Sequence, residues 1–371
     1  MKVLRFLFLV ACLLGTASAL SVAPKSTSSV SLSQVNKSLQ NANVAEMSEA
    51  KAEAVSVRGG LSDDLQQRLK VGVYFSLWYA LNIGYNIYNK KALNIIPAPW
   101  TVATIQMIVG VFVFVPMWIL RVRKAPVLSK ENIKTLFPIG ACHTLGHVSG
   151  VISLGAGAVS FTHIVKAAEP LFTALFSAVL LSQFFAWQVY MTLLPVIIGV
   201  GLASLKELSF SWTSFGGAMT SNVACALRGV FAKVSMGKPQ GKNMNASNLY
   251  SVLTIMACVL LTPVALALEG SKLSSAWDSA LATGTDSKTI IIWTLLSGFF
   301  YYTYNEVAFL ALDSVHPITH AVGNTIKRVV IIITSMIVFK TTMTPLGALG
   351  STIAILGVLA YSLAKNAFDK K

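Results

Sequence analysis

Long apolar stretches recur along this chain from about residue 70 to its end. Each is close to the roughly 20 residues that an α-helix needs to cross the hydrocarbon core of a bilayer. Short polar segments separate them, and the pattern therefore predicts an all-α polytopic membrane protein with about ten transmembrane helices. The expected spans are 71–89, 99–120, 135–154, 159–182, 185–205, 211–232, 248–268, 289–311, 317–339 and 345–364.

Two features of the spans bear on their arrangement. The third span contains Pro138 and several glycines, so the pattern allows two shorter helical pieces there. An even number of spans places both ends of the mature chain on one side of the membrane. Lys and Arg are more frequent on that side, for example between residues 121 and 134, which predicts that both termini face the cytosol-like compartment.

The residues before the first span do not belong to the predicted bundle. Residues 1–19 combine a basic start, a short apolar run and the ending Ala17-Ser18-Ala19, which is typical of a signal peptide. Residues 20–60 are rich in Ser, Ala, Val, Asn and Lys and are typical of a transit peptide, while residues 61–371 are expected to form the membrane-spanning domain. The two leading segments indicate a bipartite address to a complex plastid, and secretory entry followed by a disordered segment is the alternative.

The composition excludes an ordinary soluble enzyme. Of 371 residues, 54% are hydrophobic and 12% are charged, whereas soluble domains have about 25% charged residues. The 29 Lys and Arg exceed the 14 Asp and Glu, but no nucleic-acid-reading motif is present, so membrane topology explains the excess better than nucleic acid. The cysteines and histidines have no metal-site spacing and no nucleophile has a positioned base, so we expect no metal, no cofactor and no enzyme activity.

Charged residues inside the apolar spans are the strongest functional signal. A charge near the bilayer centre costs at least about 2.5–3.5 kcal/mol, yet Lys166, Lys327 and Arg328 lie several turns from the expected span ends. Lysine offers a point charge and arginine a planar fork, which together suit the oxygens of a phosphate. We therefore predict a phosphate site. The alternative is snorkelling, or internal salt bridges with Glu169 or Glu306.

Uncharged polar residues within the spans favour a water-filled cavity over a lipid-facing surface. They occur in the third, eighth and ninth spans and can donate hydrogen bonds to a substrate. For each histidine the alternative is a core residue bonded to a neighbouring helix. The residues are His143, His147, Ser149, Tyr304 and Asn324.

Ten spans also suggest a repeat of five plus five helices. Residues 159–163 align with residues 316–320, since both segments end in Thr-His. With that alignment each half sends a lysine inward, Lys166 from the first and Lys327 from the second. The predicted fold is thus a 5+5 inverted repeat with halves at about 70–205 and 211–365.

Five short motifs carry a family resemblance. They are Asn89-Lys90-Lys91, HTLGH at 143–147, AVSFTHIVKAAEP at 158–170, YNEVA at 304–308 and NTIKRV at 324–329. With these motifs, residues 70–365 resemble the plastid phosphate translocators of the drug/metabolite transporter superfamily, most closely the triose-phosphate/phosphate translocators. The resemblance implies a ten-helix carrier in a plastid envelope membrane that exchanges inorganic phosphate for phosphorylated three-carbon compounds.

The resemblance also implies roles for individual residues. Lys166, Lys327 and Arg328 would hold the phosphate, and His147, Arg228 and Tyr304 would contact the distal oxygen or carboxylate. His147 favours triose phosphate and 3-phosphoglycerate over phosphoenolpyruvate. For Arg228, near the end of its span, an interfacial role is the alternative. The resemblance gives supporting roles to Ser149, His143, Lys90, Glu169 and Asn324. It does not define which hydroxyl group contacts the phosphate, since this chain has Ser149-Gly150 at the place where relatives often offer a hydroxyl.

The predicted function is therefore antiport by alternating access. Inorganic phosphate would exchange for dihydroxyacetone phosphate, glyceraldehyde 3-phosphate or 3-phosphoglycerate, with no coupling ion, because an empty site of three cations is costly to occlude. The alternatives are a phosphoenolpyruvate or a hexose or pentose phosphate translocator, and an endomembrane nucleotide-sugar transporter. Membrane lipid surrounds the protein, no nucleic acid partner is expected, and a homodimer is compatible with the pattern.

Overall fold

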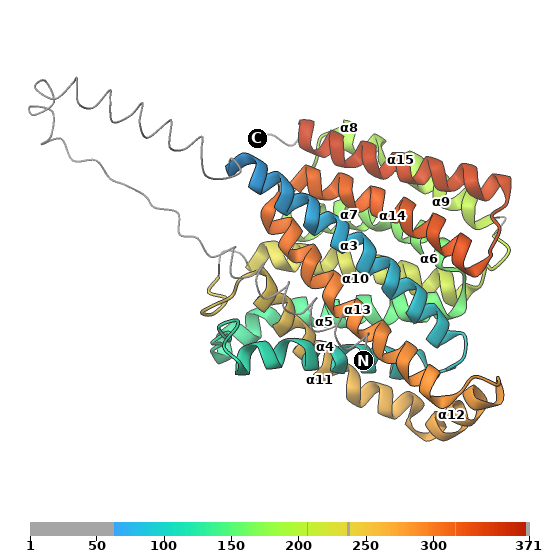
Figure 1. Ribbon diagram of the computed structural model, residues 1–371. Helices are drawn as coiled ribbons and strands as arrows, with labels where there is room; N and C mark the ends of the chain where they lie inside the picture. Colours follow the sequence, from blue (N-terminus) through green and yellow to red (C-terminus); the bar gives the residue numbers. More distant parts are fainter. Residues whose placement is uncertain (1–62, 206, 236–237, 316, 369–371) are drawn as a thin grey trace, which may run out of the picture.

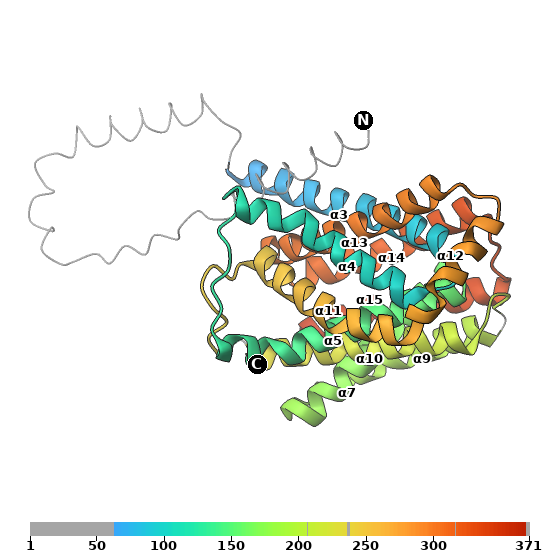
Figure 2. The same cartoon turned by 90° about the horizontal axis from the view of Figure 1, so that it is seen from below.

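The computed structural model describes residues 63–205, 207–235, 238–315 and 317–368. Nearly all of them lie in helices that pack side by side in one bundle (Figures 1 and 2). Within these residues the β-type pairing is limited to an isolated bridge between Val127 and Lys242. The predicted signal and transit segments lie outside the described residues.

In the part of the chain that the structure describes, ten long helical segments correspond one to one to the ten predicted spans, and the all-helical prediction is confirmed. The fourth and fifth segments are each built from shorter pieces. In chain order the segments are α3 (Asp63–Leu93), α4 (Pro99–Ile119), α5 (Lys130–Ala156), α6 with η2 and α7 (Val159–Val165, Lys166–Ala168, Glu169–Leu181), α8 with α9 (Trp187–Met191, Leu193–Leu205), α10 (Trp212–Ser235), α11 (Ala246–Glu269), α13 (Ser287–Ser314), α14 (Pro317–Phe339) and α15 (Pro345–Phe368).

Two local details differ from the expectation. The third segment is not divided, because α5 runs through Pro138 as a single helix. An additional short helix, α12 (Leu273–Ala282), follows α11 through the turn η3 (Gly270–Lys272). Its Ala276 and Ala280 are buried, while its serines and Asp278 are exposed, so it lies as an amphipathic helix against the bundle. Its short apolar face was not recognised in the sequence.

The helices divide into two classes by polarity. Among the described residues, six helical stretches are long and apolar enough to cross a membrane, and they contain α4, α6 with α7, α8 with α9, α11, α14 and α15. The four other long helices are α3, α5, α10 and α13, and these form two of the most extensive helix pairs, α5 with α10 and α3 with α13. The less apolar helices are thus paired with one another, as expected for helices that enclose a polar interior.

The packing pattern has the symmetry that a five-helix repeat predicts. If each span is replaced by its counterpart in the other half, five spans away, the α5–α10 pair becomes the α13–α3 pair. In the same way the α4–α13 pair becomes the α11–α5 pair. All four of these helix contacts are present. The α9–α15 pair maps onto itself. The two backbones approach each other so closely in this pair that a side chain at Gly199 would collide with Gly350 and Ala354. A shift by an odd number of spans reverses the direction of crossing, so the related helices run oppositely.

The two ends of the bundle differ in what they carry. The start of α3 and the end of α15 lie at the same end as the α4–α5 connection, on the left in Figure 1, whereas α12 lies at the other end. We call these the terminal end and the α12 end. This arrangement agrees with an even number of crossings.

Candidate substrate site

A break in the fourth span places Lys166 in the bundle interior. Pro170 has no N–H to bond the carbonyl of Lys166, and its ring would clash with that carbonyl in a regular α-helix. The chain instead forms the 3₁₀ turn η2 between α6 and α7, with Lys166 as its first residue. The Lys166 Nζ donates to Ser221 Oγ of α10 at 2.5 Å, and Ser221 donates onward to the carbonyl of Gly146 at 2.7 Å.

Arg328 of α14 reaches the same break from the other half of the chain. Its Nη2 lies 3.4 Å from Glu169 Oε2, and its Nη1 donates to the His163 carbonyl at 3.4 Å. The Arg328 side chain is 9% exposed and that of Glu169 is 32% exposed. The ion pair is thus long and partly open, which leaves room for another anion to replace the carboxylate.

Lys327 joins this group from the adjacent side of α14. Its Nζ lies 4.5 Å from the centre of the Trp78 ring, a cation–π contact, and Trp78 stacks on His320 at 4.7 Å. Lys327 interacts electrostatically with Arg328, Glu169 and Lys166. Arg328 contacts Glu169, three residues after Lys166, and Lys327 adjoins Arg328, so the three predicted phosphate residues lie in one region to which both halves of the chain contribute.

The ring of His163 marks the centre of this cationic cluster. All three cations act on it electrostatically, and its Nε2 lies 2.8 Å from Asn86 Oδ1 of α3. Asn86 in turn donates to Asn82 Oδ1 at 2.8 Å. We did not single out Asn82, Asn86, Ser221 or Trp78 from the sequence, because neutral side chains in an apolar span give no signal that distinguishes lining from core.

A second group of side chains, which we call the distal cluster, consists of the aromatic rings of His147, Tyr301, Tyr304 and Tyr85. The rings of His147 and Tyr301 are 4.0 Å apart, and Tyr304 meets Tyr301 edge-on at 5.6 Å. Tyr85 of α3 packs against both tyrosines, at 5.2 Å and 5.3 Å. The buried His147 Nε2 has no hydrogen-bond partner among the described residues, and a backbone hydrogen bond links this histidine to Ala103. Tyr85 was not recognised in the sequence.

Arg228 turns toward α5 and the distal cluster. Its Nη1 lies 3.1 Å from His143 Nδ1. Arginine can only donate, so His143 Nδ1 accepts and the histidine proton is on Nε2. Arg228 also interacts electrostatically with Tyr301 and Tyr304. This inward placement differs from the interfacial alternative.

The distal cluster lies next to the cationic cluster. The charge of Lys166 acts on His147, and the charge of Glu169 acts on Arg228. The two clusters together can hold a compact anion with a phosphate at one end and a carbonyl or carboxylate oxygen at the other.

Three of the predicted supporting residues have other surroundings. Lys90 donates to the carbonyls of Leu154 at 2.8 Å and Gly157 at 2.9 Å, and so binds the C-terminal end of α5. Ser149 is buried on α5, and the structure shows no contact between its hydroxyl and the three cations in the described part of the chain. The hydroxyl on Lys166 belongs instead to Ser221. Asn324 is half-buried on α14, one turn before Arg328.

Glu306 has a partner that the sequence did not indicate. It pairs with Arg123 at 2.7 Å, and the two side chains are 0% and 3% exposed. The sequence pattern instead places Arg123 among the loop cations and offers Glu306 as a partner for the central ones. The loop after α4 folds back so that the Arg123 backbone N–H bonds the Met117 carbonyl at 3.2 Å, which directs the guanidinium inward.

The fold and this site define a polytopic membrane protein with a cluster of cationic side chains between its two halves. The model of the Triose-phosphate Transporter family matches residues 69–362, and the chain belongs to that family. Relatives are transporters: a glucose-6-phosphate/phosphate translocator 2, chloroplastic, of Arabidopsis thaliana is 42% identical, with 81% of this chain and 76% of the relative covered. A phosphoenolpyruvate/phosphate translocator 2, chloroplastic, of the same plant is 40% identical (84% and 82% covered). A triose phosphate/phosphate translocator, non-green plastid, chloroplastic, of Brassica oleracea var. botrytis is 37% identical (85% and 78% covered).

Proposed function

We propose that this protein is an antiporter that exchanges inorganic phosphate for three-carbon phosphates. One observation carries the proposal: Lys166, Lys327 and Arg328 gather at one partly buried site, with Glu169 as the acid in contact with Arg328. Three cations and one carboxylate leave an excess of two positive charges in a low-dielectric interior. A phosphate monoester, with a charge of about −1.5 to −2 near neutral pH, matches that excess.

The same charge balance explains obligatory exchange. Moving uncompensated charges out of water costs several kcal/mol per ion, so the empty carrier does not occlude its site easily. Bound phosphate replaces Glu169 as the partner of Arg328 and removes most of that penalty. The halves then rock about the central site, and the carrier returns only when it is loaded again. Net flux follows the two substrate gradients without a coupling ion.

The distal cluster supports three-carbon substrates, namely dihydroxyacetone phosphate, glyceraldehyde 3-phosphate and 3-phosphoglycerate. His147 and Tyr304 can donate to a carbonyl or hydroxyl oxygen, and Arg228 can bind a carboxylate. Because Lys166 acts electrostatically on His147, the phosphate and distal ends of the site are close together, which suits a short ligand.

Hexose phosphate exchange is the second candidate function. The observation in its favour is that the chain is 42% identical to the glucose-6-phosphate/phosphate translocator and 37% identical to the triose phosphate/phosphate translocator. Phosphoenolpyruvate is also a substrate to be tested, since a translocator named for it is 40% identical. The choice among these substrates depends on how much space the aromatic rings leave beside His147.

The proposed location is a plastid envelope membrane. The relatives above are named as chloroplastic, and this chain shares their family and its spanning helices. The composition of residues 1–60 supports entry by the secretory pathway followed by transfer into a complex plastid.

Uptake of labelled phosphate into liposomes containing the purified full chain tests the function. Parallel samples are preloaded with phosphate, dihydroxyacetone phosphate, 3-phosphoglycerate, phosphoenolpyruvate, glucose 6-phosphate or nothing. We expect rapid uptake with the three-carbon phosphates and phosphate, and almost none into empty liposomes. Exchange only with glucose 6-phosphate would replace the three-carbon assignment, and equal filling of empty liposomes would overturn the exchange mechanism.

Variants Lys166→Gln and Lys327→Gln link the activity to the site. Each removes a cation while keeping a polar side chain of similar length. We expect each to abolish exchange while the protein still inserts and elutes as a single species. Near-normal exchange by both would remove the cationic cluster from the mechanism.

A further inference from the structure

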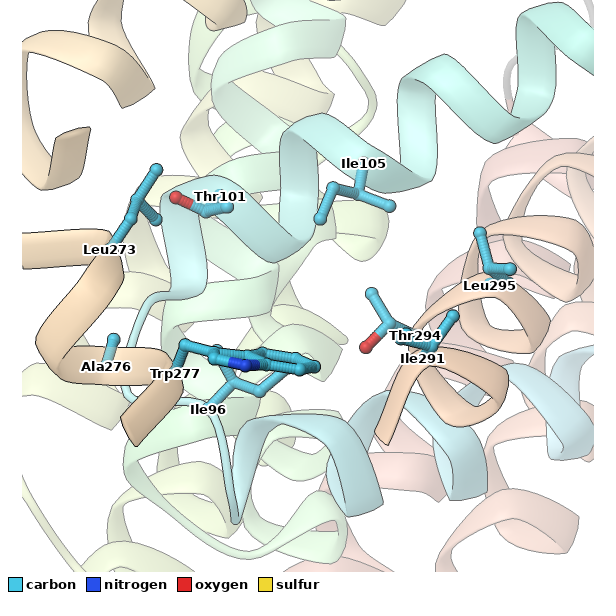
Figure 3. A pocket seen from close by; sticks show the side chains of 9 residues that line it. All are labelled: Ile96, Thr101, Ile105, Leu273, Ala276, Trp277, Ile291, Thr294 and Leu295. Carbon is cyan, nitrogen blue, oxygen red and sulfur yellow. The ribbon is translucent and has the colours of Figure 1, made fainter. Parts of the chain in front are cut away.

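Two apolar grooves lie on the outside of the bundle, away from the cationic cluster. The first, at the α12 end, has a volume of about 350 Å³ between α4, α12 and α13, and Trp277 lies across its floor (Figure 3). The second, at the terminal end, has a volume of about 440 Å³ between α4, α5 and α11, and Trp118 lies in it. We call them the α12 groove and the terminal groove.

The two grooves occupy corresponding places in the two halves. The α12 groove uses the start of α4, the α11–α13 connection and the start of α13. The terminal groove uses α11, the α4–α5 connection and the start of α5. The five-span shift that relates α4 to α11 also relates α13 to α5. One groove therefore serves as an internal comparison for the other.

The charges around the grooves differ. The segment 120–134 beside the terminal groove contains five cations and the single acid Glu131, and one of the cations, Arg123, is used internally by Glu306. The corresponding segment 270–288 beside the α12 groove contains two cations and two acids. Those cations are Lys272 and Lys288, and those acids are Asp278 and Asp286. The terminal groove thus has a basic rim and the α12 groove has a balanced one.

The basic rim is held together by loop contacts. Val127 and Lys242 exchange backbone hydrogen bonds of 3.1 Å and 3.0 Å. Asn248 at the start of α11 donates to the Lys124 carbonyl at 2.8 Å, and Asn132 donates to the Pro239 carbonyl at 2.6 Å. The exposed cations of two connections are therefore gathered at one end. They are Arg121, Lys124, Lys130, Lys134 and Lys242.

The apolar part of the terminal groove lies deeper along the helices than the cations. Lys130 and Lys134 stand one turn apart at the start of α5, and Phe137 follows about one turn deeper. On α11, Val259 lies 13 residues after the helix start, about 20 Å along the axis. Phe137 and Val259 are 50% and 67% exposed. In a membrane these faces meet acyl chains.

We propose that the terminal groove binds an anionic phospholipid of the surrounding bilayer. Its acyl chain lies along Phe137 and Val259, and its phosphate is held by Lys130, Lys134 and the neighbouring cations. A phospholipid fits both the apolar floor and the basic rim, because it joins a chain and a negative phosphate at the membrane surface. The groove joins α4 and α5 of the first half to α11 of the second, so the lipid bridges the halves. The inference is independent of the substrate exchanged at the central site.

Fluorescence quenching by brominated lipids tests the proposal, because each groove contains its own tryptophan. The full chain is placed in phosphatidylcholine bilayers that contain a brominated-chain lipid, either phosphatidylglycerol or phosphatidylcholine. The Trp118→Phe and Trp277→Phe variants give the contribution of each groove by difference. We expect brominated phosphatidylglycerol to quench Trp118 at about five-fold lower mole fraction than brominated phosphatidylcholine, the effect of about one lysine near the lipid. Trp277 should respond equally to both lipids.

Charge variants test whether the cations at the terminal groove cause the preference of Trp118 for quenching by brominated phosphatidylglycerol. Lys130→Gln with Lys134→Gln should remove the preference at Trp118, while Lys130→Arg with Lys134→Arg should keep it and shows that the positions tolerate substitution. The matched control is Lys272→Gln with Lys288→Gln at the α12 groove, which should leave the preference at Trp118 unchanged. Equal quenching of Trp118 by both lipids, or a preference that survives the two glutamines, overturns the proposal. So does the absence of any quenching at Trp118, since a protein segment would then cover the groove.

Discussion

Two arginine–glutamate pairs of the described residues connect the halves of this protein, and they are built differently. Arg123 and Glu306 are 2.7 Å apart and almost fully buried. Arg328 and Glu169 are 3.4 Å apart, and the glutamate is 32% exposed. A buried ion pair survives only when the partners compensate each other closely, because each has lost its hydration. The first pair meets that condition and the second does so only in part.

The difference separates a structural pair from a functional one. Arg123 and Glu306 neutralise each other at the terminal end and hold the α4–α5 connection against α13, although Arg123 Nε and Glu306 Oε2 have no hydrogen-bond partner among the described residues. Arg328 is next to Lys327 and near Lys166, so one long contact with Glu169 leaves the cluster with excess positive charge. A cation that is incompletely paired inside a membrane protein is available to a ligand. The following substitutions challenge this distinction, beginning with the largest expected effect.

Arg328→Gln should reduce phosphate exchange by 100-fold or more and leave the thermal stability of the protein nearly unchanged. Loss of a charge-assisted contact to a buried anion costs about 2–5 kcal/mol, and the glutamine keeps the polar contact to Glu169. Initial rates of exchange in liposomes and a thermal melt of the same preparation measure the two effects. A variant that melts much earlier but still exchanges phosphate would make this pair the structural one.

Glu306→Gln should have the opposite profile. The buried Arg123 would lose its counter-charge, at a cost of about 3–5 kcal/mol in stability. The midpoint of thermal unfolding in detergent should fall by about 6 °C or more. The double variant Arg123→Met with Glu306→Leu should recover most of the loss, because an apolar pair of similar volume replaces the ion pair. No recovery in the double variant would contradict the assignment of a simple structural pair.

Glu169→Gln sharpens the comparison within the functional pair. Without the carboxylate, Arg328 loses its competitor for phosphate and the empty site becomes more positive. We expect the KM for phosphate to fall by about three- to ten-fold, equivalent to about 1 kcal/mol, with slower maximal exchange because release becomes limiting. Concentration dependence of homoexchange measures both parameters. Glu131→Gln, at an exposed position on α5, is the matched control and should change neither.

His143→Gln tests whether a neutral neighbour positions Arg228. The glutamine cannot reproduce the geometry of the 3.1 Å contact to Nη1, so the guanidinium should lose its fixed direction. We expect the KM for 3-phosphoglycerate to rise by about three- to five-fold while phosphate homoexchange stays within two-fold, since the distal cluster does not hold the phosphate. An equal change for both ligands would show that His143 acts on the whole site.

Lys90→Gln should have the smallest effect on transport. Lys90 donates to the end of α5, and loss of these charge-assisted hydrogen bonds should lower stability by about 1–3 kcal/mol. The KM values for phosphate and three-carbon phosphates should remain unchanged. A selective change in either KM would place Lys90 with the substrate residues instead.

Much of the fold could be predicted because its signals are local in the sequence. Ten apolar stretches of helical length appear as ten helical segments, since every backbone polar group in a membrane must be satisfied within its own helix. The break at Lys166 follows from Pro170. Pro138, by contrast, lies within an unbroken α5, so a proline alone did not decide where a span divides.

The helical membrane fold and the positions of Lys166, Lys327 and Arg328 can thus be recognised from the order of residues alone, because charges inside apolar stretches stand out. The partners of the buried charges follow only from the packing of the helices. Glu169 lies 159 residues from Arg328, and Arg123 lies 183 residues from Glu306. Residues so far apart in the sequence show no repeating pattern that would reveal their contact. Whether a buried charge is satisfied depends on which helices are adjacent, and that is a property of the packed bundle.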